Sequence, residues 1–213
     1  MGVWKQIILI GAGAVAVLVV SAACIKVDTG REDPAGQTSA TATASATTPA
    51  AGTEAHNNAD LWFVRHMIPH HQQAIEMSDI VLAKHGIDPR VTEVATTIKA
   101  AQGPEIQQMQ DWLNQWGNPP MPTMPPGDMQ MPAPGGMPGM LSERELNALR
   151  EAEGVDANRL FLTQMIAHHE GAISVAQTEI EEGHYPPAVA MARSIVTTQQ
   201  QEIDTMKGVL ASL

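Results

Sequence analysis

The sequence predicts an all-α protein whose folded part is a four-helix bundle built from two repeated helical hairpins. Three observations lead to this prediction. A block that contains two adjacent histidines occurs twice, as expected when one structural unit is used twice. Helix-favouring Ala, Gln, Glu, Met and Leu dominate, and aromatic residues make up only 3% of the chain. After the N-terminal segment, apolar residues recur with the period of a helix and do not alternate as in a strand.

The repeated block is centred on the histidine pairs. Met67-Ile68-Pro69-His70-His71 recurs, nearly intact, as Met165-Ile166-Ala167-His168-His169. A second element, Gln-x-x-Glu-Ile-x-x-Met, closes each copy and begins at Gln102 and at Gln199. Other matched positions are Phe63 with Phe161, Asp60 with Asn158, and Ala74-Ile75 with Ala172-Ile173. Two such hairpins that bury their apolar faces together give a four-helix bundle.

The N-terminal segment, residues 1–24, has the features of a targeting signal. Lys5 is followed by an almost wholly apolar run that ends in small residues before Cys24, the chain's one cysteine. This end resembles a bacterial lipoprotein box, in which the chain is cleaved before the cysteine and its sulfur is lipidated. An uncleaved membrane anchor and ordinary secretion are the alternatives, although the run is short for a spanning helix, which needs about 20 residues. All three place the folded domain outside the cytoplasm, and the first predicts a lipid anchor in the cell membrane.

A tether is expected to follow, over residues 25–58. The stretch 38–53 is nearly all Ala, Thr, Ser, Pro and Gly, and it has too few apolar residues to form a core. The bundle domain is therefore expected over residues 59–213, and its first hairpin over 59–117.

The first hairpin is expected to contain two long helices. The first runs over about 59–85, with Asn57 or Asn58 as its cap and a kink at the interior Pro69. The second begins with Asp88 as cap and proline at the next position. The Gly103-Pro104 pair is expected to interrupt this second helix beside Glu105.

A loop rich in Met, Pro and Gly is expected over residues 118–141. It contains six closely spaced methionines, and at these spacings two or three thioethers can reach one soft ion. These are Met121, Met124, Met129, Met131, Met137 and Met140. The alternative is a compositionally biased linker whose methionines dock onto the bundle. A capping box at Ser142 then opens a short helix over 142–153 that Gly154 ends, and the second hairpin follows over 155–213.

Metal-ligating residue types fall on the predicted buried faces. When the first copy is drawn as a helix, Met67, His70 and His71 share one arc with its core residues. The second copy places Met165, His168 and His169 in the same way, and the following helices add Glu105, Met109, Glu202 and Met206. Imidazole binds many transition metals, and thioethers favour Cu(I) and, by the same logic, silver. The alternative is that the histidines are hydrogen-bonded core residues and the methionines fill gaps.

Both copies of the block resemble a bacterial family known as domain of unknown function 305. The resemblance rests on residues 63–75 and 161–173, on the linking segment 136–140, and on the Gln-x-x-Glu-Ile-x-x-Met elements. It covers about residues 58–213, with Ala167 and Gln164 as departures from the family pattern. It implies a ferritin-like four-helix bundle in secreted or membrane-attached proteins, some of which are linked to copper or silver binding and resistance.

The leading functional hypothesis is an extracytoplasmic metal-binding protein that sequesters or delivers Cu(I) or silver, with a metal-exchange protein as a possible partner. A net charge of −11 argues against a nucleic-acid partner, because that requires a basic surface. A ferritin-like metalloenzyme is the first alternative, but neither copy carries the Glu-x-x-His motif of di-iron bundles. A structural or partner-binding lipoprotein that binds no metal is the second.

Overall fold

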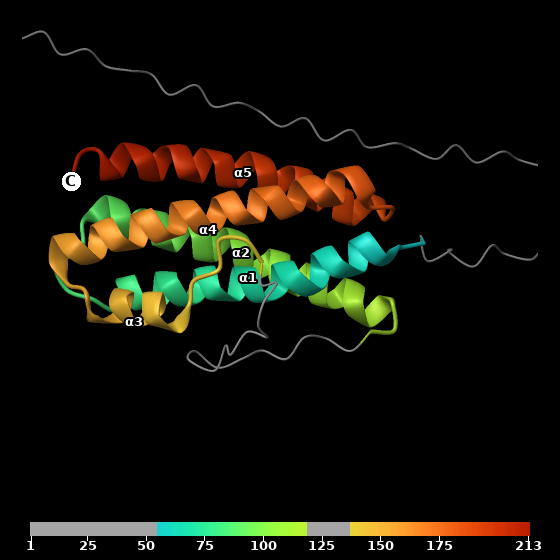
Figure 1. The fold of residues 1–213 in the computed structure, drawn as a ribbon, viewed down its shortest axis with the longest axis horizontal. Helices are drawn as coiled ribbons and strands as arrows, with labels where there is room; N and C mark the ends of the chain where they lie inside the picture. Colours follow the sequence, from blue (N-terminus) through green and yellow to red (C-terminus); the bar gives the residue numbers. More distant parts are fainter. Residues whose placement is uncertain (1–54, 119–136) are drawn as a thin grey trace, which may run out of the picture. The chain divides into compact units, whose positions relative to one another are not determined.

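The computed structural model describes residues 55–118 and 137–213, and within these ranges it contains five α-helices and no strand. The prediction of an all-α protein is confirmed. Figure 1 shows the four long helices, α1, α2, α4 and α5, packed along one another, with the short helix α3 at one side. Within the described residues, no helix is both long and apolar enough to cross a membrane.

Helix α1 spans Asn58–Leu82 and contains Pro69 without interruption. Its N-cap is Asn57, one of the two predicted caps. The Asn57 side chain accepts from the backbone N–H of Asp60, and the Asp60 side chain accepts in return from the N–H of Asn57. Both ends of this reciprocal pair are satisfied, so the helix begins at a fixed residue.

Helix α2 spans Pro89–Gln115 and begins after the predicted cap, Asp88. The expected interruption at Gly103-Pro104 is wrong, because Pro104 lies inside a continuous helix. A proline there removes the hydrogen bond to the carbonyl of Ala100. Since Ala100 and Pro104 are both exposed, water can donate a hydrogen bond to that carbonyl, and the helix continues.

The remaining helices are α3 (Glu143–Glu151), α4 (Gly154–Glu182) and α5 (Pro186–Leu210). The predicted capping box at Ser142 is present and opens α3. Gly154 does not end α3 as expected. It has a φ of 53° and is the first residue of α4.

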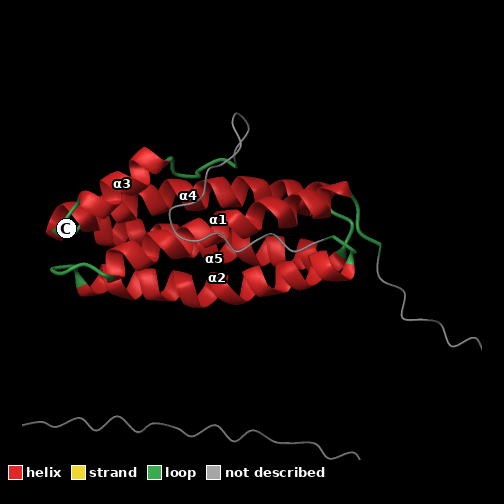
Figure 2. Ribbon diagram, turned by 90° about the horizontal axis from the view of Figure 1, so that it is seen from below, coloured by secondary structure: helices red, strands yellow, loops and turns green. Residues whose placement is uncertain are grey.

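The long helices make two extensive pairs, α1 with α2 and α4 with α5, which are joined through α1 and α4. Helices α2 and α5 also lie side by side, with a less extensive contact that we call the α2–α5 seam, as Figure 2 shows from below. Helix α3 is tied to α1 by an ion pair between Arg150 and the buried Glu76. The two pairs are thus held together mainly through α1 and α4.

The apolar core consists of two separate clusters. One contains the C-terminal part of α1 with the N-terminal parts of α2 and α4, and includes Met77, Ile98 and Phe161. The other contains the opposite ends of the same helices, and includes Phe63 and Trp112. Neighbouring long helices are therefore antiparallel, and each helix passes from one cluster to the other near its middle. The residues at this crossing are polar, and they form the candidate site.

Candidate metal centre

A layer of buried polar side chains separates the two apolar clusters, and each long helix contributes to it. We call it the histidine layer. Its members are at most 3% exposed and are His70, His71, Gln102, His168, His169 and Gln199. Buried polar groups in proteins are nearly always hydrogen-bonded, so unpaired atoms here require an explanation.

Two histidines of the layer are each held by a glutamate from the adjacent helix. Nε2 of His71 lies 2.8 Å from a carboxylate oxygen of Glu105, and Nε2 of His169 lies 2.8 Å from one of Glu202. Because a carboxylate accepts, each Nε2 carries the proton. In the neutral ring the free lone pair is then on Nδ1. Among the described residues, Nδ1 of His71 and Nδ1 of His169 have no hydrogen-bond partner. A carboxylate on the far nitrogen is the usual support of a metal-binding histidine.

The other two histidines meet at the middle of the layer. The ring centroids of His70 and His168 are 3.7 Å apart, with the planes inclined by 37°. Nε2 of His70 lies 3.3 Å from the carbonyl oxygen of Pro138 and donates to it, which leaves Nδ1 of His70 as the free lone pair. Neither nitrogen of His168 has a partner among the described residues.

Burial keeps this central pair uncharged. It lowers the pKa of His70 to about 3, an effect that His71 strengthens and the Pro138 carbonyl opposes. Burial also lowers the pKa of His168 well below 6.5, with His70 as the second cause. Both rings are therefore neutral at physiological pH. A neutral imidazole is the form that binds a metal, so the layer holds lone pairs that protons do not block.

The buried methionines flank the layer. Met67 and Met109 belong to one apolar cluster, and Met165 and Met206 to the other. All four are fully buried. The structure therefore brings the predicted thioethers to both sides of the histidines, within the two apolar clusters.

A short strap, residues 137–141, crosses the layer. Leu141 both donates to and accepts from the side chain of Gln73, at 2.7 and 2.9 Å. The strap lies so close to α4 that a Cβ added to Gly171 would stand 1.9 Å from the carbonyl oxygen of Pro138. Gly139 has a φ of 82°, which favours glycine. The strap thereby fixes the Pro138 carbonyl against His70.

Two of the six methionines in the predicted loop lie among the residues that the structure describes. Met137 is buried in the cluster of Phe63, and Met140 packs against that cluster. The others lie outside the described residues, as does the predicted lipidation site, Cys24. They are Met121, Met124, Met129 and Met131.

The ligand atoms do not form a finished coordination site. Within the described ranges, no group of three or more His, Cys, Asp or Glu side chains is arranged to hold a metal ion. The histidine layer instead supplies unpaired nitrogens that need thioethers or a change of rotamer to complete a coordination shell. A soft ion accepts two or three such ligands, so this donor set fits Cu(I) or Ag(I) chemically.

Sequence reasoning did not name Gln102 and Gln199 as site residues. Both are buried, and neither Oε1 has a hydrogen-bond partner among the described residues. Each stands one turn before the glutamate that contacts a histidine of the layer, Glu105 or Glu202, in the two copies of the Gln-x-x-Glu element. That register was the available signal, because two buried amides at matched positions are unusual in an apolar face.

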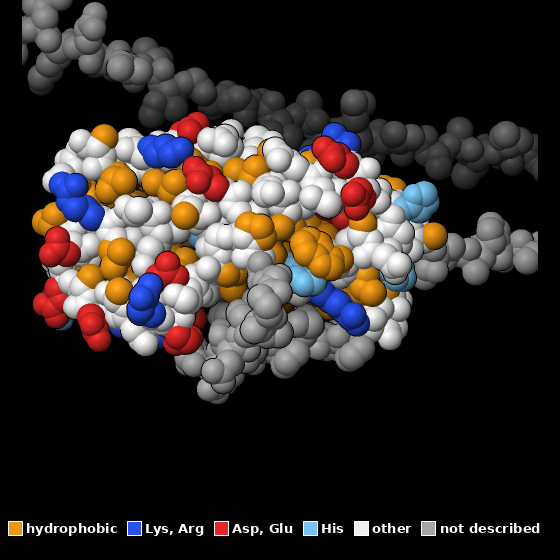
Figure 3. All heavy atoms as spheres, viewed as in Figure 1, with side chains coloured by type: hydrophobic (Ala, Val, Ile, Leu, Met, Phe, Trp, Pro, Cys, Tyr) orange, Lys and Arg blue, Asp and Glu red, His pale blue; other side chains and the backbone are white. Residues whose placement is uncertain are grey.

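The charged side chains on one face of the molecule are mixed in sign. On the face drawn in Figure 3, Lys and Arg side chains are scattered among acidic and apolar ones without forming a continuous basic patch. This agrees with the acidic net charge of the chain.

Comparison with known proteins identifies relatives. The family model described as domain of unknown function (DUF305) matches residues 60–210. A DUF305 protein from Streptomyces coelicolor, named as a candidate secreted protein, is 35% identical with a TM-score of 0.63, over 72% of this chain and 93% of that one. A DUF305 fragment from Deinococcus radiodurans is 34% identical with a TM-score of 0.63, over 74% and 98%.

A further solved structure similar to this chain is CopM in its Cu(I)-bound form. It is 29% identical with a TM-score of 0.58, over 72% of this chain and 96% of that one. CopM structures with Cu(II) and with silver also match. A search of curated proteins finds no match.

Proposed function

Because the chain belongs to the DUF305 family, we propose that it is an extracytoplasmic metal-binding protein that sequesters or delivers Cu(I) or Ag(I). The observation that carries this proposal is the histidine layer. Four buried histidines each keep at least one ring nitrogen that has no partner within residues 55–118 and 137–213, and fully buried methionines flank them. Leaving such atoms unpaired costs about 1–3 kcal/mol each. A bound ion offsets that cost, whereas an ordinary apolar core would avoid it.

The assignment of each residue follows from its surroundings. Nδ1 of His70, His71 and His169 and a nitrogen of His168 serve as the imidazole ligands, and Glu105 and Glu202 orient two of the rings from behind. In the loaded site the glutamates therefore act through the histidines. Thioethers of Met67, Met109, Met165 and Met206 complete the shell.

The metal preference draws on CopM, which has been solved with Cu(I), Cu(II) and silver. The soft thioethers favour the monovalent ions. The Met-rich loop over 118–141 is proposed as a second, weaker capture element. Met137 and Met140 at its end already lie against the domain that holds the histidines.

The architecture proposed for this function is a ferritin-like four-helix bundle formed by two repeated hairpins, over residues 59–213. The two His–Glu contacts, equal in length and at matched positions, support the repeat. A signal segment over 1–24 and a tether over 25–58 complete the proposed organisation. Lipidation of Cys24 would hold the domain at the outer face of the cell membrane.

The decisive experiment is elemental analysis of the purified protein after incubation with Cu(I), Ag(I), Zn(II) or Fe(II) and removal of free metal. We expect retention of copper and silver, and its loss when His70, His71, His168 and His169 are all changed to Ala. His85→Ala, at an exposed histidine, is the matched control. Iron bound in pairs with oxygen consumption would favour a metalloenzyme, and retention of no metal would favour a structural protein.

A further inference from the structure

The four histidines of the layer are at most 1% exposed, so an ion can reach them only through a gap between helices. The α2–α5 seam contains such a gap. A groove of about 250 Å³ lies there, lined from α2 by Arg90, Glu93, Val94 and Thr97 and from α5 by Glu202, Thr205 and Val209. We call it the α2–α5 groove.

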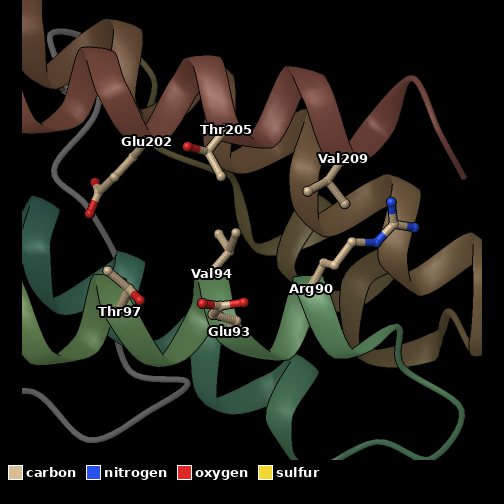
Figure 4. A pocket seen from close by; sticks show the side chains of 7 residues that line it. All are labelled: Arg90, Glu93, Val94, Thr97, Glu202, Thr205 and Val209. Carbon is tan, nitrogen blue, oxygen red and sulfur yellow. The ribbon is translucent and has the colours of Figure 1, made fainter. Parts of the chain in front are cut away.

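One residue connects this groove to the histidine layer. Glu202 lines the groove, and its side chain is 16% exposed, while its carboxylate also lies 2.8 Å from Nε2 of the fully buried His169. Figure 4 shows Glu202 reaching from α5 toward α2 at the end of the groove where Thr97 lies. A cation in the groove can thus contact a carboxylate that already touches a buried ligand.

The charge distribution of the groove suits a cation. Glu93, exposed on α2, adds a second carboxylate, and Thr97 and Thr205 add hydroxyl oxygens. The one cationic residue of the lining, Arg90, lies at the end opposite Glu202 (Figure 4). Its guanidinium donates to both carboxylate oxygens of Asp88 and to the hydroxyl of Ser212, so its charge is neutralised and held away.

We propose that the α2–α5 groove is the passage through which a soft monovalent cation enters and leaves the histidine layer, with Glu202 passing the ion to and from His169. This inference rests on the proposed function. It assigns the groove a kinetic role. An ion that arrives at Glu202 binds its carboxylate in place of the Nε2–H of His169, and the released ring can turn to present the lone pair on Nδ1.

The test is to block the groove without touching a ligand. Thr97→Phe and Thr205→Phe place a large apolar side chain between α2 and α5, and both threonines are exposed, so the fold should tolerate the change. Thr96→Phe is the matched control, because Thr96 is exposed on the same helix but does not line the groove. Transfer of Cu(I) from and to a chromophoric chelator, without oxygen, gives the rates of loading and release and the equilibrium Kd.

We expect each blocking variant to load and release Cu(I) at least tenfold more slowly than the parent, with an unchanged Kd. A blocked passage raises the barrier equally in both directions. Thr96→Phe should match the parent. Glu93→Gln, which blocks nothing, should slow loading at low ionic strength only, because salt screens the attraction of an exposed carboxylate.

The outcomes separate the two proposals. If the parent binds no Cu(I) or Ag(I), the proposed function fails and the passage fails with it. If the parent binds but both blocking variants load at the parental rate, the passage alone is overturned. A blocking variant whose Kd weakens as much as its loading rate falls would also overturn it, because the change would then act on the site itself.

Discussion

At the scale of single residues, two buried carboxyl groups near the start of α1 hold protons very differently. Asp60 is buried, which alone would raise its pKa, but hydrogen bonds from the N–H groups of Asn57, Tyr185 and His184 lower it overall. Glu179 is 1% exposed and faces the Asp60 charge. Burial first, and Asp60 second, raise the pKa of Glu179 to about 8.

This arrangement predicts a pH-dependent stability. The pKa of Glu179 is raised from 4.5 in the unfolded chain to about 8 in the folded one, so the folded state binds more protons between these values. The contribution of Glu179 to the free energy of unfolding is therefore most favourable below about pH 4.5. It falls by about 1.4 kcal/mol per pH unit as the pH rises toward 8. Glu179→Gln removes this loss, and urea unfolding should show a stabilisation that is larger at pH 8.5 than at pH 5.

The control for this prediction is Glu181→Gln, which removes the same charge from an exposed position of the same helix. It should leave the pH dependence unchanged. A stabilisation by Glu179→Gln of equal size at both pH values would contradict the assignment, because it would then arise from something other than the proton on Glu179.

Close contact between the strap and α4 gives a second residue-scale prediction. Gly171→Ala places a Cβ against the Pro138 carbonyl oxygen, which must move, and we expect a loss of about 1–3 kcal/mol in the free energy of unfolding. Gly208→Ala is the control on α5, where nothing lies within 4 Å of the added Cβ. It should stabilise the helix by up to about 1 kcal/mol. Thermal unfolding of both variants shows whether each change lowers or raises stability. If Gly171→Ala leaves the stability unchanged, the strap is not held against α4.

At the scale of elements, the first turns of α1 and α4 hold the starts of the helices opposite. Asp60 in α1 accepts from the backbone N–H groups that precede α5, at 2.9 and 3.0 Å. Asn158 in α4 accepts from the N–H of Asp88, the cap of α2, at 3.1 Å. Each hairpin turn is thus fixed by the other pair of helices, which sets the register of the histidine layer.

The two anchors differ in the number of donors they satisfy, and this predicts unequal costs of removal. Asp60→Ala removes the carboxylate that accepts three part-buried backbone N–H hydrogen bonds, and we expect a loss of about 2–4 kcal/mol in the free energy of unfolding. Asn158→Ala leaves one and should cost about 1 kcal/mol. Chemical denaturation of the two variants measures both values, and equal losses would argue against this division.

These elements also show how far sequence reasoning reaches. The helix starts were predictable, because Asp88 and Ser142 carry local capping chemistry that the sequence displays. Gly103-Pro104 was misjudged because its effect depends on which face of α2 meets water. Glu105 and Glu202 were predicted as metal ligands, but their partners, the histidines of the neighbouring helices, depend on how the helices pack. Repetition in the sequence identifies positions that matter, and packing decides what each one contacts.

At the scale of the whole molecule, the histidine layer at the centre of the core lowers the stability of the fold. Two apolar clusters would merge into one if the histidine layer were apolar. Replacing unsatisfied buried polar groups with apolar groups of similar shape is often neutral or stabilising. Protein sites that bind ligands commonly reduce stability in this way. The central pair, His70 and His168, is where this effect should be largest, because neither is held by a glutamate.

The double substitution His70→Leu with His168→Leu should therefore have opposite effects on the two forms of the protein. The metal-free variant should unfold at a higher temperature than the metal-free parent, because the unpaired nitrogens are gone and the two clusters join. Saturating Ag(I) should stabilise the parent by about 2.7 kcal/mol at a concentration of 100 Kd, because it binds only the folded state. The variant should gain little from Ag(I). Thermal unfolding with and without Ag(I) measures both effects, with His66→Leu as a control at a partly exposed histidine of α1. A variant that is less stable without metal yet keeps the full Ag(I) response would mean that the central pair serves packing and that the ion binds elsewhere.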